Sequence, residues 1–418
     1  MQSLGDIFGQ VFRAIWANKL RSFLTMFGIA WGVGSMLLLI GVGEGFQEGQ
    51  KQQLSRFGTD VVMVWNGTAP AVASQQLAMR PYYLTLRDEQ AIATEAPDVR
   101  AITAMLSSSN MQQQSLYQTV SGSVNGVQVN YPDVRLLPIA EGRFLNVSDE
   151  ANRNLVAVLG QESAAKLFPG HPALGSYITL GGYRFLVVGI AAKIGHGNNT
   201  WMNQQIYIPL TVMLNRFPIT GDNVPSDAVS TLQYKPRTPA EHLDAVAEVH
   251  AIIARRHGFD PNATEAFNEW DTIQTVNMVN KIFESMNMFL GSVGLVTLAL
   301  GGLGIVNIML VSVTERTREI GVRKALGATR KSILMQFFIE GLTLTALSGL
   351  VGIGGASGFM WILQQLIGNG MQGFAAPHVV PWTAALAFGS LALCGILAGL
   401  YPASRAASLE PVEALRKE

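Results

Sequence analysis

The sequence predicts a membrane α-helical protein with four transmembrane helices in a 1 + 3 layout and a large extracytoplasmic α+β domain inserted between helices 1 and 2. Three observations predict this fold. Only 14% of the 418 residues are charged and 49% are hydrophobic, whereas soluble domains carry roughly 25% charged residues. Four apolar stretches are long enough to cross about 30 Å of hydrocarbon, which takes roughly 20 helical residues. Lysine and arginine gather on one side of these stretches.

The four predicted spans share sufficient length and a scarcity of charge. They are Phe23–Gly43, Met286–Val313, Ile333–Leu363 and Thr383–Pro402. The first stretch is too long for the apolar region of a signal peptide, and no small-residue cleavage site follows it, so we expect an uncleaved anchor. Residues 1–22 are predicted to form a cytoplasmic amphipathic helix before it.

The distribution of positive charge predicts the orientation. Basic residues precede the first span, six of them lie in the segment Thr314–Ser332, and others follow the fourth span, whereas residues 364–382 contain neither Lys nor Arg. Positively charged segments stay in the cytoplasm, and an even number of spans places both termini on one side. We therefore expect a multi-pass membrane protein with both termini and the tail 403–418 in the cytoplasm. The net charge of zero gives no indication of nucleic-acid binding.

Residues 44–285 are predicted to form the external domain. Short β-rich runs alternate with turns, and Glu241–His257 has the apolar periodicity of an amphipathic helix. The polar segments Gly45–Phe57 and Thr272–Met286 are expected to continue the first two spans out of the membrane as stalk helices. A second subdomain is expected at about 127–230.

Sequence motifs for catalysis or metal binding are absent. The chain has neither a GxxxxGK[ST] phosphate loop nor a GxSxG motif, and its histidines are scattered without metal-ligand spacing. The lone cysteine, Cys394, can form neither an internal disulfide nor a cysteine zinc cluster. We expect a chain that is not an enzyme and that binds no metal or cofactor itself.

The basic segment 314–332 is predicted to form a short amphipathic helix, a turn and the start of the third span. Glu319 precedes Arg323 by four residues, which favours an intrahelical ion pair. Gly327 suits a helix C-terminus and Thr329 suits the cap of the next helix. Val322, Ala325 and Leu326 would form an apolar strip too small to insert deeply into lipid. Two interpretations remain, a docking surface for a protein groove or a topology signal that lies on anionic headgroups.

The run from Glu319 to Ala328, EIGVRKALGA, resembles the cytoplasmic signature of ABC transporter permeases of the MacB/FtsX-like family (type VII), roughly E-I-G-[IV]-[RL]-[RK]-A-[LI]-G-A. The first span, the external runs EGRFLN and LFPG, and the tail YPASRAASLEPVEALR are similar to further landmarks of this family. The resemblance covers essentially the whole chain. It is strongest to the macrolide-exporter type, with a MacB-like core domain, as a permease subunit without a fused ATPase.

The resemblance implies a permease subunit that couples ATP hydrolysis by a separate cytoplasmic ATPase to conformational change of the external domain, called mechanotransmission. ATP and Mg would bind the ATPase, and a second permease chain would complete a homodimer. Export of drugs, peptides or lipophilic cargo would be its task, with a periplasmic adaptor (membrane fusion protein) and an outer-membrane duct. The resemblance assigns ATPase coupling to six residues. They are Glu319, Gly321, Arg323, Lys324, Gly327 and Ala328.

Three alternatives remain open at this point. The chain could be an FtsX-like signalling subunit that regulates a cell-wall hydrolase, or a lipoprotein-release permease. It could also be a membrane enzyme with its site in the external domain, although the absence of catalytic motifs argues against this.

Two features inside the spans are candidates for packing or function. Pairs of glycines four residues apart allow close helix contact, either within the chain or at a permease dimer. The pairs are Gly28/Gly32, Gly354/Gly358 and Gly395/Gly399. Glu340 is a candidate intramembrane polar site, because carboxylates are rare in spans unless they have a function.

Overall fold

The computed structural model describes residues 19–55, 60–72, 75–194, 201–367, 375, 377 and 381–408. The chain divides into two compact units. One, here called the membrane unit, comprises Met1–Gly49 and Asn280–Glu418, and the other, the external domain, comprises Gln50–Val279. Most of the helix predicted over residues 1–22, of the predicted loop 364–382 and of the tail 403–418 lies outside the described residues.

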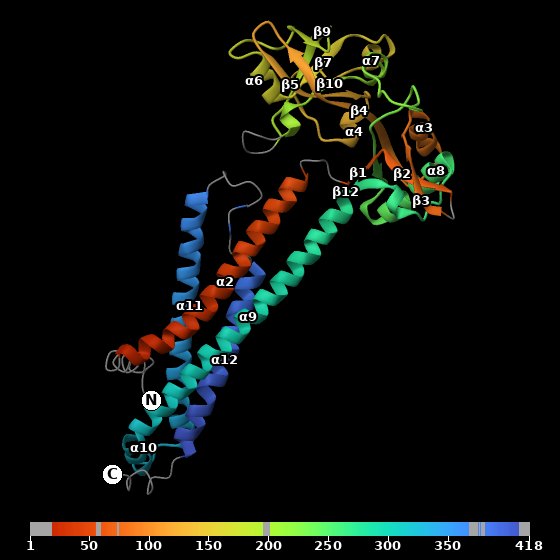
Figure 1. The fold of residues 1–418 in the computed structure, drawn as a ribbon. Coiled ribbons are helices and arrows are strands. Elements are labelled where there is room, and N and C mark those ends of the chain that lie inside the picture. The colour runs from red at the N-terminus through yellow and green to blue at the C-terminus, as the bar shows by residue number, and fades with distance from the viewer. Residues whose placement is uncertain are drawn as a thin grey trace. The chain divides into compact units, whose positions relative to one another are not determined.

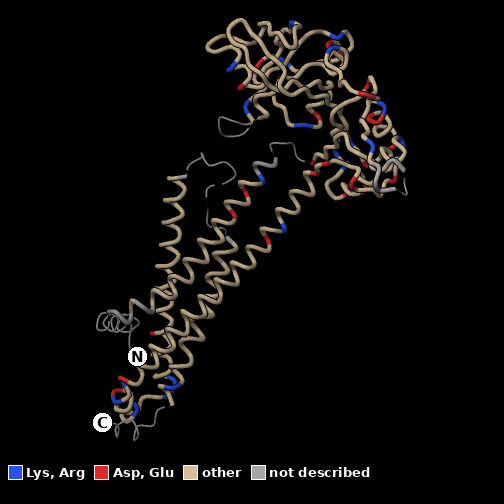
Figure 2. Tube along the Cα trace, in the orientation of Figure 1, with Lys and Arg blue, Asp and Glu red and all other residues tan. Residues whose placement is uncertain are grey.

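Four of the described helices are long and apolar enough to cross a membrane, which confirms the predicted number of spans. They are α2 (Lys19–Ser55), α9 (Thr272–Glu315), α11 (Arg330–Ile367) and α12 (Pro381–Ser408), and the short α10 (Thr317–Ala325) lies between α9 and α11 (Figure 1). Figure 2 shows that charged residues are sparse along the spans and cluster at α10.

Two helices extend beyond the apolar stretches, as the polar stalk segments predict. The helix α9 runs without interruption for 44 residues, so the segment from Thr272 to Met286 is part of the same helix as the second span. Likewise, α2 continues past the apolar stretch as far as Ser55. Each stalk is therefore a direct helical extension of a span.

Small residues set the helix spacing in the membrane unit. A Cβ atom added to Gly301 would lie 3.0 Å from the backbone of Gly28, and one added to Gly341 would lie 3.2 Å from the Cα atom of Gly399. Glycine allows backbones to approach in this way because it has no side chain. Between these contacts, apolar side chains such as Ile29, Ile305 and Phe337 are buried together.

The external domain contains a ten-stranded mixed sheet with the strand order β12-β1-β11-β4-β5-β10-β7-β9-β6, and β8 pairs with β4 and β9. The strands β2 and β3 form a separate hairpin. The bounds are β1 Val62–Trp65, β2 Gly67–Val72, β3 Gln75–Tyr82, β4 Val99–Gln114, β5 Thr119–Val127, β6 Ile139–Gly142, β7 Val156–Leu159, β8 Tyr177–Leu180, β9 Tyr183–Ala191, β10 Ile206–Pro209, β11 Thr231–Pro236 and β12 Asn268–Asp271.

Helices pack beside this sheet and complete the predicted α+β domain. They are α3 Leu86–Glu95, α4 Tyr131–Val134, α5 Val147–Ala151, α6 Gln161–Leu167, α7 Leu210–Arg216 and α8 His242–His257. The amphipathic helix predicted over Glu241–His257 is confirmed as α8, which buries Ala245, Val249, Ile252 and Ile253.

The long strand β4 connects the two parts of the sheet. It pairs with β11 near its beginning and with β5 and β8 further along its 16 residues. A separate buried cluster that includes Tyr131, Val158 and Tyr207 lies within residues 127–230. One continuous sheet therefore crosses the limits of the second subdomain expected there, whose boundaries stay a prediction.

Candidate coupling site

The segment between α9 and α11 forms the predicted helix, turn and helix. Hydrogen bonds from Arg316 N to Ser312 O (3.1 Å) and from Ile320 N to Arg316 O (3.0 Å) carry α9 almost directly into α10. Gly327 has a φ of 100°, a conformation that glycine adopts readily and other residues rarely adopt. Thr329 then caps α11, since its Oγ1 accepts a hydrogen bond from Ser332 N at 3.2 Å. The roles predicted for Gly327 and Thr329 are confirmed.

One face of α10 is buried against the membrane unit. Ile320 is 2% exposed and belongs to the same apolar cluster as Ile333 and Phe337 of α11. Gly321 is buried beside it. Burial of a side chain as large as isoleucine contributes roughly 1.5–3 kcal/mol, so α10 is packed onto the helices rather than lying free.

Polar contacts hold α10 in this position. Arg323 Nη1 donates to Gln336 Oε1 at 3.0 Å, and Lys324 Nζ donates to the carbonyl oxygen of Ala407 at 2.5 Å. The third joins Arg316 Nη1 to Glu340 Oε1 at 3.5 Å. The prediction of a Glu319–Arg323 ion pair was wrong. The ion pairs of the described residues do not include it, because the Arg323 guanidinium is directed to Gln336 of α11.

The opposite face of α10 is exposed. Val322 is 43% exposed and Leu326 is 83% exposed, and Arg318, Glu319 and Ala325 are exposed on the same helix. The two apolar side chains are four residues apart and therefore lie on one face. We call Val322, Ala325 and Leu326 the apolar strip. A short apolar strip surrounded by charges is the composition of a protein-docking surface rather than of a deeply inserted helix.

The six residues predicted for coupling thus occupy different places. Glu319 is exposed, Gly321 is buried, Gly327 forms the turn and Ala328 is half-buried. Arg323 and Lys324 are half-buried and bind within the chain. The signature did not identify Arg318, Gln336 or the Arg316–Glu340 pair. Helical spacing could have found Arg318, which lies four residues before Val322, but the partners on α11 required the fold.

The other end of α9 is fixed to the sheet of the external domain. Thr272 Oγ1 donates to Val61 O at 2.7 Å and accepts from Val61 N at 2.9 Å. Asp271 Oδ1 accepts from the amides of Ile273 at 2.7 Å and Gln274 at 3.0 Å, which caps the helix. We call this the outer junction of α9. An Asp before a predicted helix was the available sequence signal for it.

The three glycine pairs have different surroundings. A Cβ atom at Gly28 or Gly32 would lie 3.2–3.5 Å from the backbone of α9, and one at Gly395 or Gly399 would lie 3.2–3.4 Å from Thr345 or Phe338 of α11. A Cβ atom at Gly354 or Gly358 would meet nothing within 4 Å among the described residues. The first and third pairs therefore lie at contacts within the chain, whereas the described residues leave space beside the second pair.

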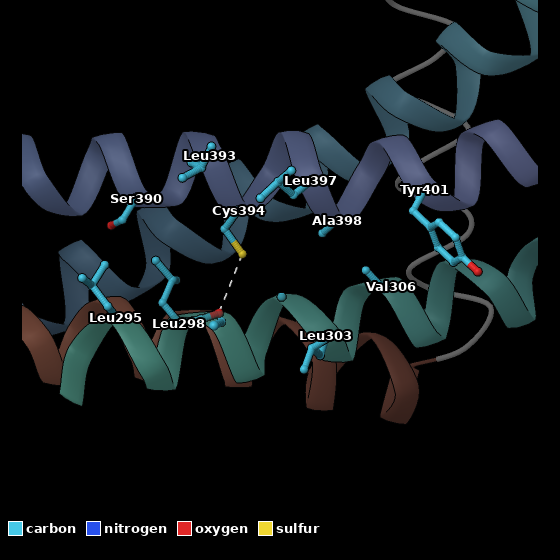
Figure 3. A pocket seen from close by; sticks show the side chains of 12 residues that line it. Leu295, Leu298, Leu303, Val306, Ser390, Leu393, Cys394, Leu397, Ala398 and Tyr401 are labelled. Atoms are coloured by element: carbon cyan, nitrogen blue, oxygen red, sulfur yellow. Dashed lines mark hydrogen bonds between the residues drawn. The ribbon is translucent and has the colours of Figure 1, made fainter. Parts of the chain in front are cut away.

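An apolar groove of about 700 Å³ lies between α9 and α12 (Figure 3). Leucines from both helices line it, including Leu298, Leu303 and Leu397, and Cys394 Sγ donates to Leu298 O at 3.7 Å. Its polar side chains are those of Ser390, Cys394 and Tyr401. Such a lining suits contact with apolar chains more than passage of a hydrophilic solute.

Several titratable groups of the external domain have structural partners. His257 Nε2 lies 3.1 Å from Asp88 Oδ2, and His250 Nε2 lies 2.8 Å from Glu269 Oε2. Asp149 is paired with Arg143 at 2.6 Å. Across the described part of the chain, no group of three or more His, Cys, Asp or Glu side chains could hold a metal ion.

Comparison with known proteins gives two matches to family models. Residues 22–252 match the MacB-like periplasmic core domain, and residues 291–411 match the FtsX-like permease C-terminal domain. The first match includes most of the external domain, and the second includes α10, α11 and α12 together with most of the second span.

Relatives with similar sequences extend over nearly the whole chain. The macrolide export ATP-binding/permease protein MacB of Bdellovibrio bacteriovorus is 31% identical over 98% of this chain, which spans 61% of that relative. The uncharacterized ABC transporter permease YknZ of Bacillus subtilis is 31% identical, with 97% of both chains covered. The crystal structure of the periplasmic region of MacB from Actinobacillus actinomycetemcomitans aligns with 55% of this chain and 98% of its own, at 17% identity and a TM-score of 0.43.

Proposed function

Because the chain belongs to the MacB/FtsX-like ABC transporter permease family, we propose that it couples ATP hydrolysis by a cytoplasmic ATPase to a conformational change of its external domain. It is a multi-pass protein of the inner membrane with a MacB-like periplasmic domain between its first and second spans. The termini and α10 would face the cytoplasm, as the positive charge of residues 314–332 indicates.

The exposed apolar strip of α10 carries this proposal. The other face of α10 is packed onto α11, and Val322 and Leu326 are therefore available to a partner without any change in the fold. The surrounding charges favour a polar rim around a small apolar centre, which is the usual anatomy of a docking site. An ABC ATPase with a complementary groove is the partner, and it would bind the ATP and Mg.

The route from α10 to the external domain is α9. Backbone hydrogen bonds join α10 to the end of α9, and α9 is one helix as far as the outer junction. Force applied to α10 would therefore reach Thr272 and strand β1 through a continuous helix. The residues assigned to coupling then divide into a docking strip and the contacts that hold it.

Export is the process that this coupling would serve. The MacB relative is named for macrolide export, and this name favours export over cell-wall signalling or lipoprotein release. We extend the proposal to drugs, peptides or lipophilic cargo, a second copy of the permease, and a periplasmic adaptor with an outer-membrane duct. The small residues at Gly354 and Gly358 would suit the seam between two copies.

Co-purification tests the proposed docking. The full chain would be reconstituted in nanodiscs with candidate ABC ATPases, as wild type, as Leu326→Asp and as Leu116→Asp. Leu116 is 92% exposed in the external domain and is the matched control. We expect Leu326→Asp to weaken ATPase binding by about 2 kcal/mol or more, as for a hot-spot residue, and Leu116→Asp to have no effect. Retention of the ATPase by Leu326→Asp at wild-type affinity would refute the docking strip.

A further inference from the structure

Two polar contacts form a short ladder between α10 and α11. Arg316 and Arg323 are seven residues apart, and their partners Glu340 and Gln336 are four residues apart on α11. Both spacings keep side chains on one face of a helix. The first arginine in the chain contacts the second partner, as expected where two helices run antiparallel from the turn at Gly327.

Of the two contacts, the one between Arg316 and Glu340 is an ion pair. Glu340 is 8% exposed, and its carboxylate belongs to a membrane-spanning helix. A carboxylate there needs a partner, because few other groups in hydrocarbon can stabilise its charge. The Arg316 side chain, 33% exposed, supplies that partner from the start of α10. Each group is therefore left uncompensated if the other is neutralised.

The ladder lies away from the apolar strip. Ile320 is buried between α10 and α11, whereas Val322 and Leu326 are exposed. An ATPase bound to the strip would leave the Arg316–Glu340 contact untouched. The contact can therefore affect the transmission of motion after ATPase binding without being part of the binding surface.

We propose that Arg316 and Glu340 are positioning residues that make α10 and the first turns of α11 move as one body when the ATPase displaces α10. This inference rests on the proposed function. Without the pair, the start of α10 could shift over α11, since Ile320 gives apolar contact without a fixed direction and the contacts of Arg323 and Lys324 lie near the other end of α10. With the pair, displacement passes into α11 and, through the close contact of Gly341 with Gly399, into α12.

A double-mutant cycle tests the pair. Arg316→Gln, Glu340→Gln and the double variant would be assembled with the ATPase in nanodiscs, with Glu284→Gln on the exposed surface of α9 as control. The readouts are ATPase retention, ATP hydrolysis, and the ATP-dependent change in hydrogen exchange over α11 and α12, residues 330–367 and 381–408. We expect each single variant to retain the ATPase. The ATP-dependent change in hydrogen exchange should become about tenfold smaller, which corresponds to a coupling free energy in the usual range.

The double variant distinguishes a pair from two independent residues. If the residues act as one unit, neutralising both will cost no more than neutralising one, because no lone buried charge remains. Losses that multiply would overturn the inference, as would undiminished coupling in both single variants. Arg316→Lys, which keeps the charge, should couple as wild type and remains informative if Glu340→Gln fails to fold. A wild-type chain that retains no ATPase would instead refute the proposed function itself.

Discussion

The external domain and the membrane unit are held together by different kinds of contact. In the external domain, Asp88 is 1% exposed and binds Arg256 at 2.5 Å and His257 at 3.1 Å, which ties α3 to α8. In the membrane unit, the close approaches are glycine against backbone, as at Gly301 and Gly28. Ion pairs fix both distance and direction, whereas glycine contacts fix distance alone.

This difference suits the two units to different tasks. An external domain with directional buried contacts can be displaced as a body and keep its shape. Helices packed through small residues can shift against one another without breaking hydrogen bonds. Within the membrane unit, the polar contacts of α10 fix direction as well as distance, and they lie where force would enter.

The largest expected effect is the loss of the Asp88 contacts. Asp88→Asn should destabilise the external domain by about 4 kcal/mol, because the variant would remove the buried carboxylate that binds both Arg256 and His257. Hydrogen exchange of α3 and α8 amides in the full chain measures this loss. Glu95→Gln is the matched control, since the Glu95–Arg255 pair is exposed and should contribute less than about 1 kcal/mol. Equal losses in the two variants would contradict the comparison.

Glu89, the residue after Asp88, should make the stability of the external domain depend on pH. The sign of this dependence is opposite to that of a salt-bridged acid. Burial raises the pKa of Glu89 to about 7, with a smaller contribution from Glu150, against the lowering effect of a hydrogen bond from Gln128. Its contribution to stability is complete below pH 4.5 and is lost as the pH rises to about 7.

Glu89→Gln should therefore match the wild type near pH 4 and exceed its stability by about 3 kcal/mol at pH 8. Denaturation of the full chain at the two pH values, followed by hydrogen exchange of α3, measures the difference. A variant whose advantage is the same at both pH values would show that Glu89 is not the group responsible.

Two glycines on α11 probe the membrane unit. A Cβ atom at Gly352 would lie 2.5 Å from the carbonyl oxygen of Ala30, so Gly352→Ala should cost about 2 kcal/mol through overpacking. A Cβ atom at Gly354 would meet no described atom within 4 Å. Gly354→Ala should therefore stabilise the helix by up to about 1 kcal/mol, because alanine has the higher helix propensity. Thermal melting in detergent compares the two. Dissociation of a permease dimer by Gly354→Ala alone would support a dimer seam at this face, and equal melting of both variants would refute the packing argument.

The smallest expected effect on stability is at the outer junction. Thr272→Val leaves Val61 N without the hydroxyl that it binds and should cost about 1 kcal/mol. It should nevertheless reduce the ATP-dependent signal in the external domain while ATPase binding stays unchanged. Thr94→Val, on the exposed side of α3, is the control. A Thr272→Val chain with an undiminished signal would show that α9 does not transmit through this contact.

Much of the architecture could be predicted from local sequence. Hydropathy gave the four spans, polar helical runs gave the stalks, and Gly327 and Thr329 marked the turn because one tolerates positive φ and the other caps a helix. Contacts between distant segments could not be obtained in this way. The partner of Arg323 depends on how α11 folds back, and the open face at Gly354 depends on which side of α11 meets α2 and α12.

Hydrogen exchange over residues 268–279 in the assembled complex tests the central claim most directly. It would be followed with and without ATP in the wild type and in Leu326→Asp. Our account predicts that ATP changes exchange at the outer junction in the wild type and that Leu326→Asp abolishes this change. An ATPase that binds and turns over on the wild-type chain while exchange at the outer junction stays constant would contradict it.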